Sequence, residues 1–311
     1  MQGVHCLVTG ANGYIGRGLL SALFESGCSV SAQTRPGSPP LFLASGTHYQ
    51  CDFGAGDWDL PLEGVDVLFH LAGIAHQQGD VGHYQAVNVD ATLALANKAL
   101  SAGVRRFVFI SSVKAGAAER DSEGELLPLA ESRNPYAQSK ALAEAGLEAR
   151  CQGADTELII VRPALVYSED APGHLRWLRR WTRLHLPAPP PGGERSMIAL
   201  ADLLALLTHL KNAPLREQTR VTVTDGERYS TRRLHKALCA AGQTQPWCPS
   251  PPALFWKAAC ALLDGIRGES RGSTWARMTG DECYPSSGLD ALGFHPRLNF
   301  ESSLGVSIDA P

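Results

Sequence analysis

Residues 4–16 of the chain read VHCLVTGANGYIG. An apolar run at residues 4–8 is followed at once by glycines at positions 10, 13 and 16. After a strand, this Gly-x-x-Gly-x-x-Gly spacing allows a tight turn into a helix, close approach of a pyrophosphate, and close packing of the helix on the strand. The free amides at the N-terminus of such a helix attract phosphate. The stretch therefore predicts a turn that binds a dinucleotide.

The first half of the chain alternates between strand-like and helix-like patterns. Apolar runs typical of strands lie at residues 4–8, 28–33, 65–71, 104–110 and 157–162. Helical patterns lie between them, at residues 14–26, 83–102 and 135–151. This alternation predicts an α/β fold, a Rossmann-type doubly wound parallel sheet.

After residue 165 the pattern becomes less regular, because proline- and glycine-rich breaks divide the chain into short pieces. We expect residues 1–165 to form an NAD(P)-binding domain and residues 166–311 to form a smaller C-terminal substrate-binding domain. The strand-like run Val221–Thr224 indicates that residues 196–228 return to the main sheet.

Composition excludes several classes of protein. Apolar residues make up 44% of the 311 residues, and the formal net charge is −3, which gives no reason to expect binding to nucleic acid. The apolar stretch Ala253–Leu263 is interrupted by Lys257 and is too short to be an integral membrane segment. A strand at the very start leaves no room for a signal peptide, so we expect a cytoplasmic protein.

Cysteines and histidines do not indicate a metal site. The eight cysteines are scattered without a Cys-x-x-Cys pair, and several lie in apolar runs, where a thiol acts as a small hydrophobe. This usage favours a reducing compartment. His70 and His76 have no third ligand at a useful spacing, so we predict no metal.

Tyr136 and Lys140 are predicted to share one face of a helix that Asn134 caps. A free phenol has a pKa of about 10, so ionising it at pH 7 costs about 4 kcal/mol, and a nearby lysine stabilises the phenolate. Ser111-Ser112 follows an apolar strand, at the end where α/β sheets bind ligands. These positions predict Ser112, Tyr136 and Lys140 as catalytic residues for hydride transfer at a carbonyl or carbinol carbon.

The end of the second predicted strand bears on the choice of cofactor. Residues 31–35 read SAQTR, with an arginine and without an acid. A carboxylate at this point binds the ribose hydroxyls of NAD, whereas an arginine accommodates the phosphate of NADP. Arg35 therefore favours NADP(H), and NAD remains possible.

Further motifs run through the whole chain. They are Asp52-Phe53, His70–Gly73, Asn88–Thr92, Arg162-Pro163, Arg195 seven residues before Asp202, and Leu292–Pro296. Together with Thr9–Gly16, Ser111-Ser112 and Tyr136–Lys140, they make the chain resemble an extended short-chain dehydrogenase/reductase of the nucleotide-sugar epimerase/dehydratase family.

This resemblance implies a role for each matching residue. With Arg35 and Ser111, the residues expected to bind the cofactor are Gly10, Asn12, Gly13, Tyr14, Ile15, Gly16, Asp52, Phe53, Leu71, Ala72, Gly73, Asn88, Tyr136, Lys140 and Pro163. Asp52 and Phe53 would flank the adenine, and Asn88 would support the site from the next helix. Substrate would contact Ser112, Tyr136, His174 and Arg195, the arginine through the nucleotide phosphates. Relatives commonly dimerise, so a homodimer through residues 83–102 and 135–151 is possible.

Departures from the family pattern narrow the reaction. Family dehydratases follow the catalytic Thr with an Asp-Glu pair, whereas Val113-Lys114 follows Ser112 here, which disfavours dehydration. Residues 110–115 resemble the bacterial branch that reduces 4-keto-6-deoxy nucleotide sugars for O-antigen synthesis. With Arg35, this predicts NADPH-dependent reduction of a UDP-4-keto-6-deoxy-hexosamine at C4, for surface polysaccharide synthesis.

Several alternatives stay open at this point. A UDP-hexose 4-epimerase with tightly bound NAD comes second, followed by a reductase of a steroid or flavonoid carbonyl and a non-catalytic dinucleotide sensor. The intact Ser, Tyr and Lys set argues against the sensor. The basic, aromatic stretch Arg176–Arg183 is compatible with a diphosphate site, an acidic membrane surface, or a helix with buried Trp and solvated Arg.

Overall fold

The computed structural model describes residues 3–41, 43, 46–56, 58–75, 81–214, 219–245, 250–268 and 270–306. His76 lies outside these ranges. The chain divides into two compact units. The first comprises Met1–Pro163, Leu203–Val223 and Ser287–His295, and the second comprises Ala164–Asp202, Thr224–Ser286 and Pro296–Pro311.

A seven-stranded sheet in the order β3-β2-β1-β4-β5-β6-β9 forms the centre of the first unit, with every neighbouring pair parallel. The strands are β1 (His5–Thr9), β2 (Ser29–Thr34), β3 (His48–Gln50), β4 (Val67–His70), β5 (Arg106–Ile110), β6 (Glu157–Pro163) and β9 (Thr219–Val223). The prediction of a Rossmann-type α/β sheet is confirmed.

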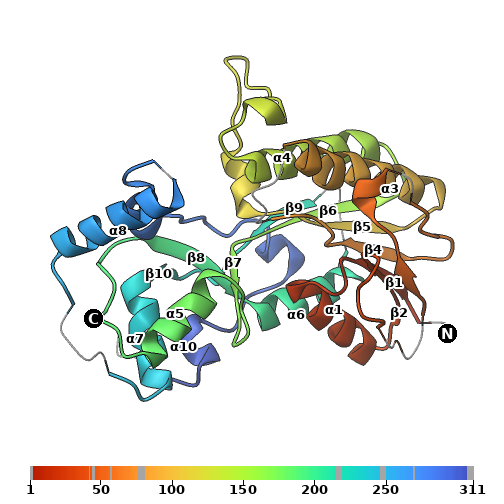
Figure 1. Ribbon diagram of the computed structural model, residues 1–311. Helices are drawn as coiled ribbons and strands as arrows, with labels where there is room; N and C mark the ends of the chain where they lie inside the picture. The colour runs from red at the N-terminus through yellow and green to blue at the C-terminus, as the bar shows by residue number, and fades with distance from the viewer. Residues whose placement is uncertain are drawn as a thin grey trace. The chain divides into compact units, whose positions relative to one another are not determined.

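Helices cover both faces of this sheet, with α3 and α4 on one face and α1 and α6 on the other (Figure 1). The helices are α1 (Tyr14–Glu25), α2 (Val81–Tyr84), α3 (Ala91–Ser101), α4 (Pro135–Cys151) and α6 (Leu200–Leu210), of which α6 belongs to the first unit from Leu203 on. Because both faces are covered, the central strands have to be apolar along their whole length. All five residues of β5 are buried, and the four that follow Arg106 are apolar.

The core between the sheet and helices α3 and α4 contains Leu68, Phe107 and Leu147. Cys51 and Cys151 are buried in the same cluster, and burial raises the pKa of both thiols above the ordinary value. Both cysteines act as small hydrophobic side chains in this core, although polar residues flank them in the sequence. Among the described residues, no helix combines the length and the apolar character needed to cross a membrane.

The second unit contains a three-stranded sheet in the order β10-β8-β7. Its strands are β7 (Leu165–Tyr167), β8 (Glu194–Ala199) and β10 (Arg228–Ser230), and its helices are α5 (His174–Arg183), α7 (Thr231–Ala241), α8 (Ala253–Arg267), α9 (Ser273–Thr279) and α10 (Phe300–Ser303). The central strand β8 pairs in parallel with β7 and antiparallel with β10.

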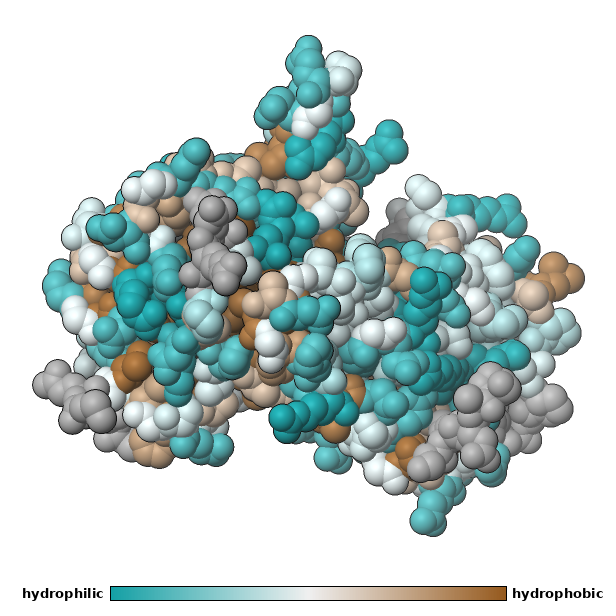
Figure 2. Space-filling view, turned by 180° about the vertical axis from the view of Figure 1, so that it is seen from behind, coloured by the Kyte–Doolittle hydropathy of each residue, from teal (hydrophilic) through white to brown (hydrophobic). Residues whose placement is uncertain are grey.

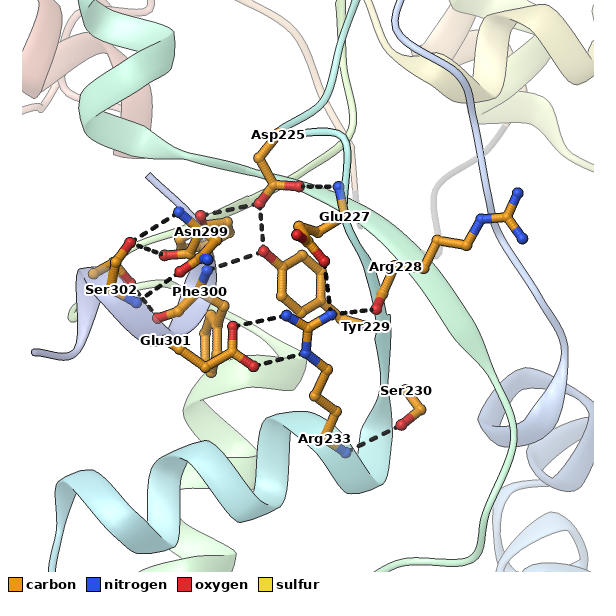
Figure 3. Close-up of polar contacts among 12 residues, drawn as sticks. Asp225, Glu227, Arg228, Tyr229, Ser230, Arg233, Asn299, Phe300, Glu301 and Ser302 are labelled. Carbon is orange, nitrogen blue, oxygen red and sulfur yellow. Dashed lines mark hydrogen bonds and ion pairs between the residues drawn. The ribbon is translucent and has the colours of Figure 1, made fainter. Parts of the chain in front are cut away.

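Two polar clusters stabilise the second unit (Figure 3). The hydroxyls of Tyr167 and Tyr229 both donate to the Asp225 carboxylate, at 3.1 and 2.7 Å. Beside them, the Arg233 guanidinium donates to both carboxylate oxygens of Glu301, at 2.7 and 3.0 Å. Burial raises the pKa of Asp225 to about 6.

Candidate active site

The glycine turn after β1 has the close contacts that the sequence predicts. Gly10 has a positive φ of 64°, and a Cβ there would lie 2.8 Å from the amide nitrogen of Ala72. A Cβ at Gly16 would lie 2.5 Å from the Gly10 carbonyl oxygen. A side chain at either position would therefore clash with the backbone of the turn that leads into α1. The N-cap of α1 is Gly13. The amides that begin α1 fit the pyrophosphate of a dinucleotide.

Gln33, near the end of β2, holds this turn in place. Its side-chain oxygen accepts from the Gly10 amide at 3.0 Å, and its amide group donates to the carbonyls of Thr34 and Cys51. Asn12 is tied to the same region, because its side chain donates to the Ser38 hydroxyl at 2.9 Å. Sequence reasoning identified Asn12 but missed Gln33, whose contacts with Gly10 and Cys51 depend on the tertiary fold.

Parallel strands bring the other predicted cofactor residues to one edge of the sheet. Arg35 follows β2, residues 71–73 follow β4, Ser111-Ser112 follows β5, and Pro163 ends β6. Leu71 and Ala72 are fixed there because both of their amides donate to the Thr9 hydroxyl, each at 3.2 Å. The carboxyl edge therefore carries the chemistry-bearing residues of the first unit.

Tyr136 and Ser112 form the polar centre of this edge. Burial raises the pKa of the Tyr136 phenol above its ordinary value, while a side-chain hydrogen bond with Ser112 acts in the lowering direction. Ser112 also accepts a hydrogen bond from the Lys114 amide, at 3.2 Å. The raised pKa differs from the lowering that the sequence led us to expect from Lys140, because partial burial of the phenol disfavours its ionised form. Tyr136 therefore holds its proton at neutral pH.

Lys140 lies one turn further along α4 and is buried. Its Nζ donates to the Ile110 carbonyl at 3.0 Å and lies 4.7 Å from the centre of the Phe109 ring. Burial lowers the pKa of Lys140 to about 8, and the nearby Glu144 carboxylate acts in the opposite direction. A Cβ at Gly73 would lie 3.3 Å from Nζ, so the segment after β4 passes directly against this amine.

Asn88 supports the site from a π-helical turn, Gln85–Asp90, that separates α2 from α3. Its side chain accepts from the Ile74 amide at 2.9 Å and donates to the Ile74 carbonyl at 3.0 Å. It also donates to the Ser139 hydroxyl, which in turn donates to the Tyr136 carbonyl. Asn88 therefore connects the segment after β4 to the helix that carries Tyr136.

Glu144 is a site residue that sequence reasoning missed. It is almost fully buried, and it accepts hydrogen bonds from the Ser111 hydroxyl and from both Nε and a terminal nitrogen of Arg162. The hydroxyl of Ser111, predicted to bind cofactor, is thus directed at Glu144. A signal existed, because Tyr136, Lys140 and Glu144 follow one another at intervals of four on a single helix face.

Three further predicted cofactor residues differ in their exposure. Arg35 is exposed just beyond β2. Asp52 is also exposed, and its carboxylate accepts from the Gly54 amide at 2.9 Å. Phe53 is buried, with its ring 4.8 Å from that of Trp58 and 5.9 Å from that of His70. Its side chain thus packs in the core, next to the position expected for an adenine.

His70 is part of this packing and holds β4 in place. Its two ring nitrogens make hydrogen bonds to the hydroxyls of Thr9 and Thr92, at 2.8 and 2.9 Å. Burial lowers the pKa of His70 to about 3, so the ring is neutral at physiological pH. A neutral imidazole with both nitrogens occupied by hydroxyls connects β1, β4 and α3.

The two remaining predicted residues, His174 and Arg195, belong to the second unit. His174 begins α5 and Arg195 lies on β8. Partial burial and the Arg195 cation lower the pKa of His174, so the structure brings these two predicted substrate residues together. The Arg195 guanidinium also donates to the carbonyl of Arg277.

Comparisons with known proteins agree with this geometry. Residues 6–184 match the sequence profile of a family described as NAD-dependent epimerase/dehydratase. A UDP-glucose 4-epimerase of Vibrio cholerae is 28% identical over 271 residues, which cover 81% of this chain and 80% of that protein.

Solved structures are similar over nearly the whole chain. MoeE5 in complex with UDP-glucose and NAD has a TM-score of 0.73 and 22% identity, covering 97% of this chain and 96% of that one. A UDP-N-acetylglucosamine 4-epimerase from Methanobrevibacter ruminantium, in complex with UDP-N-acetylmuramic acid, has a TM-score of 0.72 and 19% identity, covering 98% and 96%. The chain therefore belongs to the NAD-dependent epimerase/dehydratase family and is an enzyme of the extended short-chain dehydrogenase/reductase type.

Proposed function

We propose that this enzyme uses NADPH to reduce the C4 ketone of a UDP-4-keto-6-deoxy-hexosamine. The observation that carries the proposal is the partly buried Tyr136 phenol, which is hydrogen-bonded to Ser112 at the carboxyl edge of the sheet and lies one helical turn from Lys140. A protonated phenol beside the ketone oxygen can donate its proton to that oxygen as hydride adds to the carbon, as reduction requires. An epimerase must begin with the opposite step, removal of a proton from a hydroxyl.

Each residue of the set has a task in this reaction. Bound NADPH supplies the hydride that adds to the carbonyl carbon. Ser112 and Tyr136 donate hydrogen bonds to the ketone oxygen, and Tyr136 then transfers its proton to that oxygen to form the product hydroxyl. The positive charge of Lys140 stabilises the phenolate that remains.

The preference for NADPH rests on the end of β2. Near the carboxyl end of β2, the buried Gln33 contacts the glycine turn through its neutral amide. Arg35 is exposed just beyond the end of this strand. An arginine in this position attracts a 2′-phosphate, whereas a carboxylate would repel it. We expect Arg35→Ser to raise KM for NADPH about 10–100-fold and to leave KM for NADH nearly unchanged. Arg150→Ser, which removes an exposed arginine near the end of α4, is the control.

The nucleotide sugar is proposed from the three relatives described above, each of which has a UDP-sugar in its name or description. In the second unit, Arg195 and His174 are the residues proposed to contact its phosphates. A homodimer through α3 and α4 is also retained as a proposal, and light scattering on the purified protein tests it.

Incubation of the purified enzyme with UDP-4-keto-6-deoxy-GlcNAc and NADPH tests the reaction. We expect NADPH absorbance to disappear in step with formation of one reduced sugar. Tyr136→Phe should abolish this turnover while the variant still binds NADPH. Tyr49→Phe, on β3, is the matched control and should remain active.

A UDP-hexose 4-epimerase is the second candidate, favoured by the similarity to the Vibrio cholerae enzyme over four-fifths of both chains. This candidate predicts stoichiometric NAD in the purified protein. It also predicts interconversion of UDP-GlcNAc and UDP-GalNAc without added cofactor. Those two results, together with no oxidation of NADPH, would replace the reductase by the epimerase.

A further inference from the structure

Helix α8 of the second unit presents two very different faces. Trp256, Cys260 and Asp264, at intervals of four, are buried. Asp264 anchors this face, because its carboxylate accepts from the amides of Gly272 and Thr274 at 2.7 and 2.9 Å. The only acidic side chain of residues 253–267 is therefore used internally.

The outer face of α8 is apolar and exposed. Leu254, Ala258, Leu262 and Ile266 follow one another at intervals of four, and we call them the α8 row. Leu254, Leu262 and Ile266 are 78%, 68% and 74% exposed, and Phe255 beside them is 58% exposed. Figure 2 shows apolar surface at the right-hand edge, where α8 lies. Soluble proteins rarely leave such a continuous apolar stripe uncovered.

Helix α5 contacts α8 through a row of neighbouring indole rings that are tilted relative to one another. The ring centres of Trp177 and Trp181 are 4.7 Å apart, and those of Trp181 and Trp256 are 5.9 Å apart. Trp177 itself is 54% exposed, although it belongs to this row of rings. The buried face of α8 therefore packs against α5 within the second unit, and each of the two helices also has an exposed face.

The charges on this region have one sign. Arg176, Arg180 and Arg183 are exposed and, at spacings of four and three, share a face of α5 next to Trp177. Residues 174–183 contain no acidic residue. On α8, Lys257 is exposed, with its Nζ 5.4 Å from the centre of the Trp275 ring. The second unit thus has exposed cations and an exposed Trp on α5, and an exposed apolar row with one cation on α8, the helix that packs against it.

We propose that this region binds the surface of an anionic lipid bilayer. The α8 row enters the boundary between head groups and acyl chains, Trp177 lies at head-group level, and the three arginines of α5 pair with lipid phosphates. Helix α8 has 15 residues, which suits a position in the plane of the interface.

A second copy of the chain is the other occupant that an apolar face could take. A two-fold contact places the same patch on both sides of the interface, so the arginines and Lys257 of one copy would face those of the other. Like charges brought together in this way oppose association, whereas anionic lipid neutralises them. Charge complementarity therefore favours the bilayer.

Flotation of the full-length protein with phosphatidylcholine vesicles, with and without phosphatidylglycerol, tests the proposal. We expect binding to the anionic vesicles, weakening as salt is added, and little binding to the neutral ones. The double variant Leu262→Glu and Ile266→Glu should abolish binding. Its control is Phe24→Glu, which alters an exposed aromatic on α1 and should leave binding unchanged.

The charge contribution is tested separately with Arg176→Gln, Arg180→Gln and Arg183→Gln combined. At about 1 kcal/mol for each cation near an anionic surface, affinity should fall about 100-fold. Lys236→Gln, on the exposed side of α7, is the control and should have little effect. All variants alter exposed side chains, and circular dichroism melting curves verify that they fold.

Two results would overturn the proposal. One is the absence of binding to phosphatidylglycerol vesicles at low salt by the folded wild-type protein. The other is self-association, measured by light scattering, that the Leu262→Glu and Ile266→Glu double variant abolishes while vesicle binding is undetectable. The second result would assign the α8 row to a second copy of the chain.

Discussion

Glu144 in the first unit and Asp225 in the second are carboxylates held in different ways. In the first unit, Glu144 accepts two hydrogen bonds from the Arg162 guanidinium and one from Ser111. In the second unit, Asp225 is held by two neutral phenols, and burial raises its pKa to about 6. Loss of hydration, with no cation beside it, raises the pKa of Asp225, while the hydrogen bonds from the two phenols act in the lowering direction.

Two tyrosines, Tyr229 in the second unit and Tyr136 in the first, also differ in their partners. Tyr229 donates to Asp225 and accepts from the Phe300 amide at 3.0 Å, so its hydroxyl is used within the fold. Tyr136 shares a hydrogen bond with Ser112 at the carboxyl edge of the sheet. Burial raises the pKa of both phenols. The difference lies in their partners, which indicates a structural role for Tyr229 and a chemical role for Tyr136.

Substituting each tyrosine separates these roles and should give the largest effect. Tyr136→Phe removes the proton donor, so we expect kcat to fall about 100- to 10,000-fold with little change in melting temperature. Tyr229→Phe leaves Asp225 and the Phe300 amide each short of a partner and should cost about 1–3 kcal/mol of stability while turnover survives. Kinetics and thermal melts on both variants measure this, and a stable but inactive Tyr229→Phe would contradict the division.

Removing Glu144 should have the next largest effect. Glu144→Ala leaves the Arg162 cation and the Ser111 hydroxyl without their carboxylate, and we expect a loss of about 3–5 kcal/mol in the free energy of unfolding. Glu148→Ala, one turn later on α4 and a third exposed, should cost less than about 1 kcal/mol. Urea denaturation measures both changes. Equal losses of unfolding free energy in the two variants would show that the buried pair of Glu144 and Arg162 stabilises the fold no more than an exposed ion pair does.

The pH dependence of reduction reports on Lys140. Because burial lowers its pKa to about 8, the amine loses its proton as pH rises through that value. The charge that stabilises the phenolate is then lost, and we expect kcat to fall up to about tenfold per pH unit above 8. Lys140→Met should be slower at every pH and should lack this decline. A wild-type rate that stays constant up to pH 10 would rule out the assigned role.

Asp225 should give the smallest effect, on stability rather than on rate. Its folded pKa of about 6 lies above the ordinary value of 3.8, so the folded state binds this proton more tightly than the unfolded chain. The resulting stabilisation is complete below about pH 4 and is lost as pH rises through 6, with a magnitude of order 1 kcal/mol after allowance for solvent screening.

The variant Asp225→Asn should therefore lose this part of the pH dependence of the free energy of unfolding, measured from pH 4 to pH 7. Asp290→Asn, whose side chain is 93% exposed, should keep the wild-type dependence. Identical slopes in the wild type and Asp225→Asn would mean that the carboxylate is already ionised in the folded protein.

Residues linked by local spacing could be predicted from the sequence. Tyr136 and Lys140 lie one turn apart on a helix that Asn134 caps, its side chain accepting from the Ala137 amide at 3.1 Å. The glycines after β1 are set by the turn itself. Both features depend on neighbours within a few positions, so the pattern of residue types is sufficient to find them.

Contacts made across the fold could not be predicted in this way. Glu144 gains its role from Arg162, which lies on β6, and Gln33 gains its role from Gly10 and Cys51 on other segments. The sequence also gives the wrong direction for the pKa shift of Tyr136. The burial that raises this pKa depends on the elements around α4, which the sequence of α4 alone does not show.

The π-helical turn Gln85–Asp90 requires a fixed number of residues between α2 and α3. In this segment the number of residues matters more than their types. Removing one residue from a helical turn rotates everything beyond it by about 100°. With its present length, the segment points Asn88 at Ile74 while α3 still presents Leu95 and Ala99 to the core. A single deletion between Tyr84 and Ala91 would misdirect one set or the other. We therefore expect related enzymes to have no insertions or deletions in this segment, even where they have different residue types.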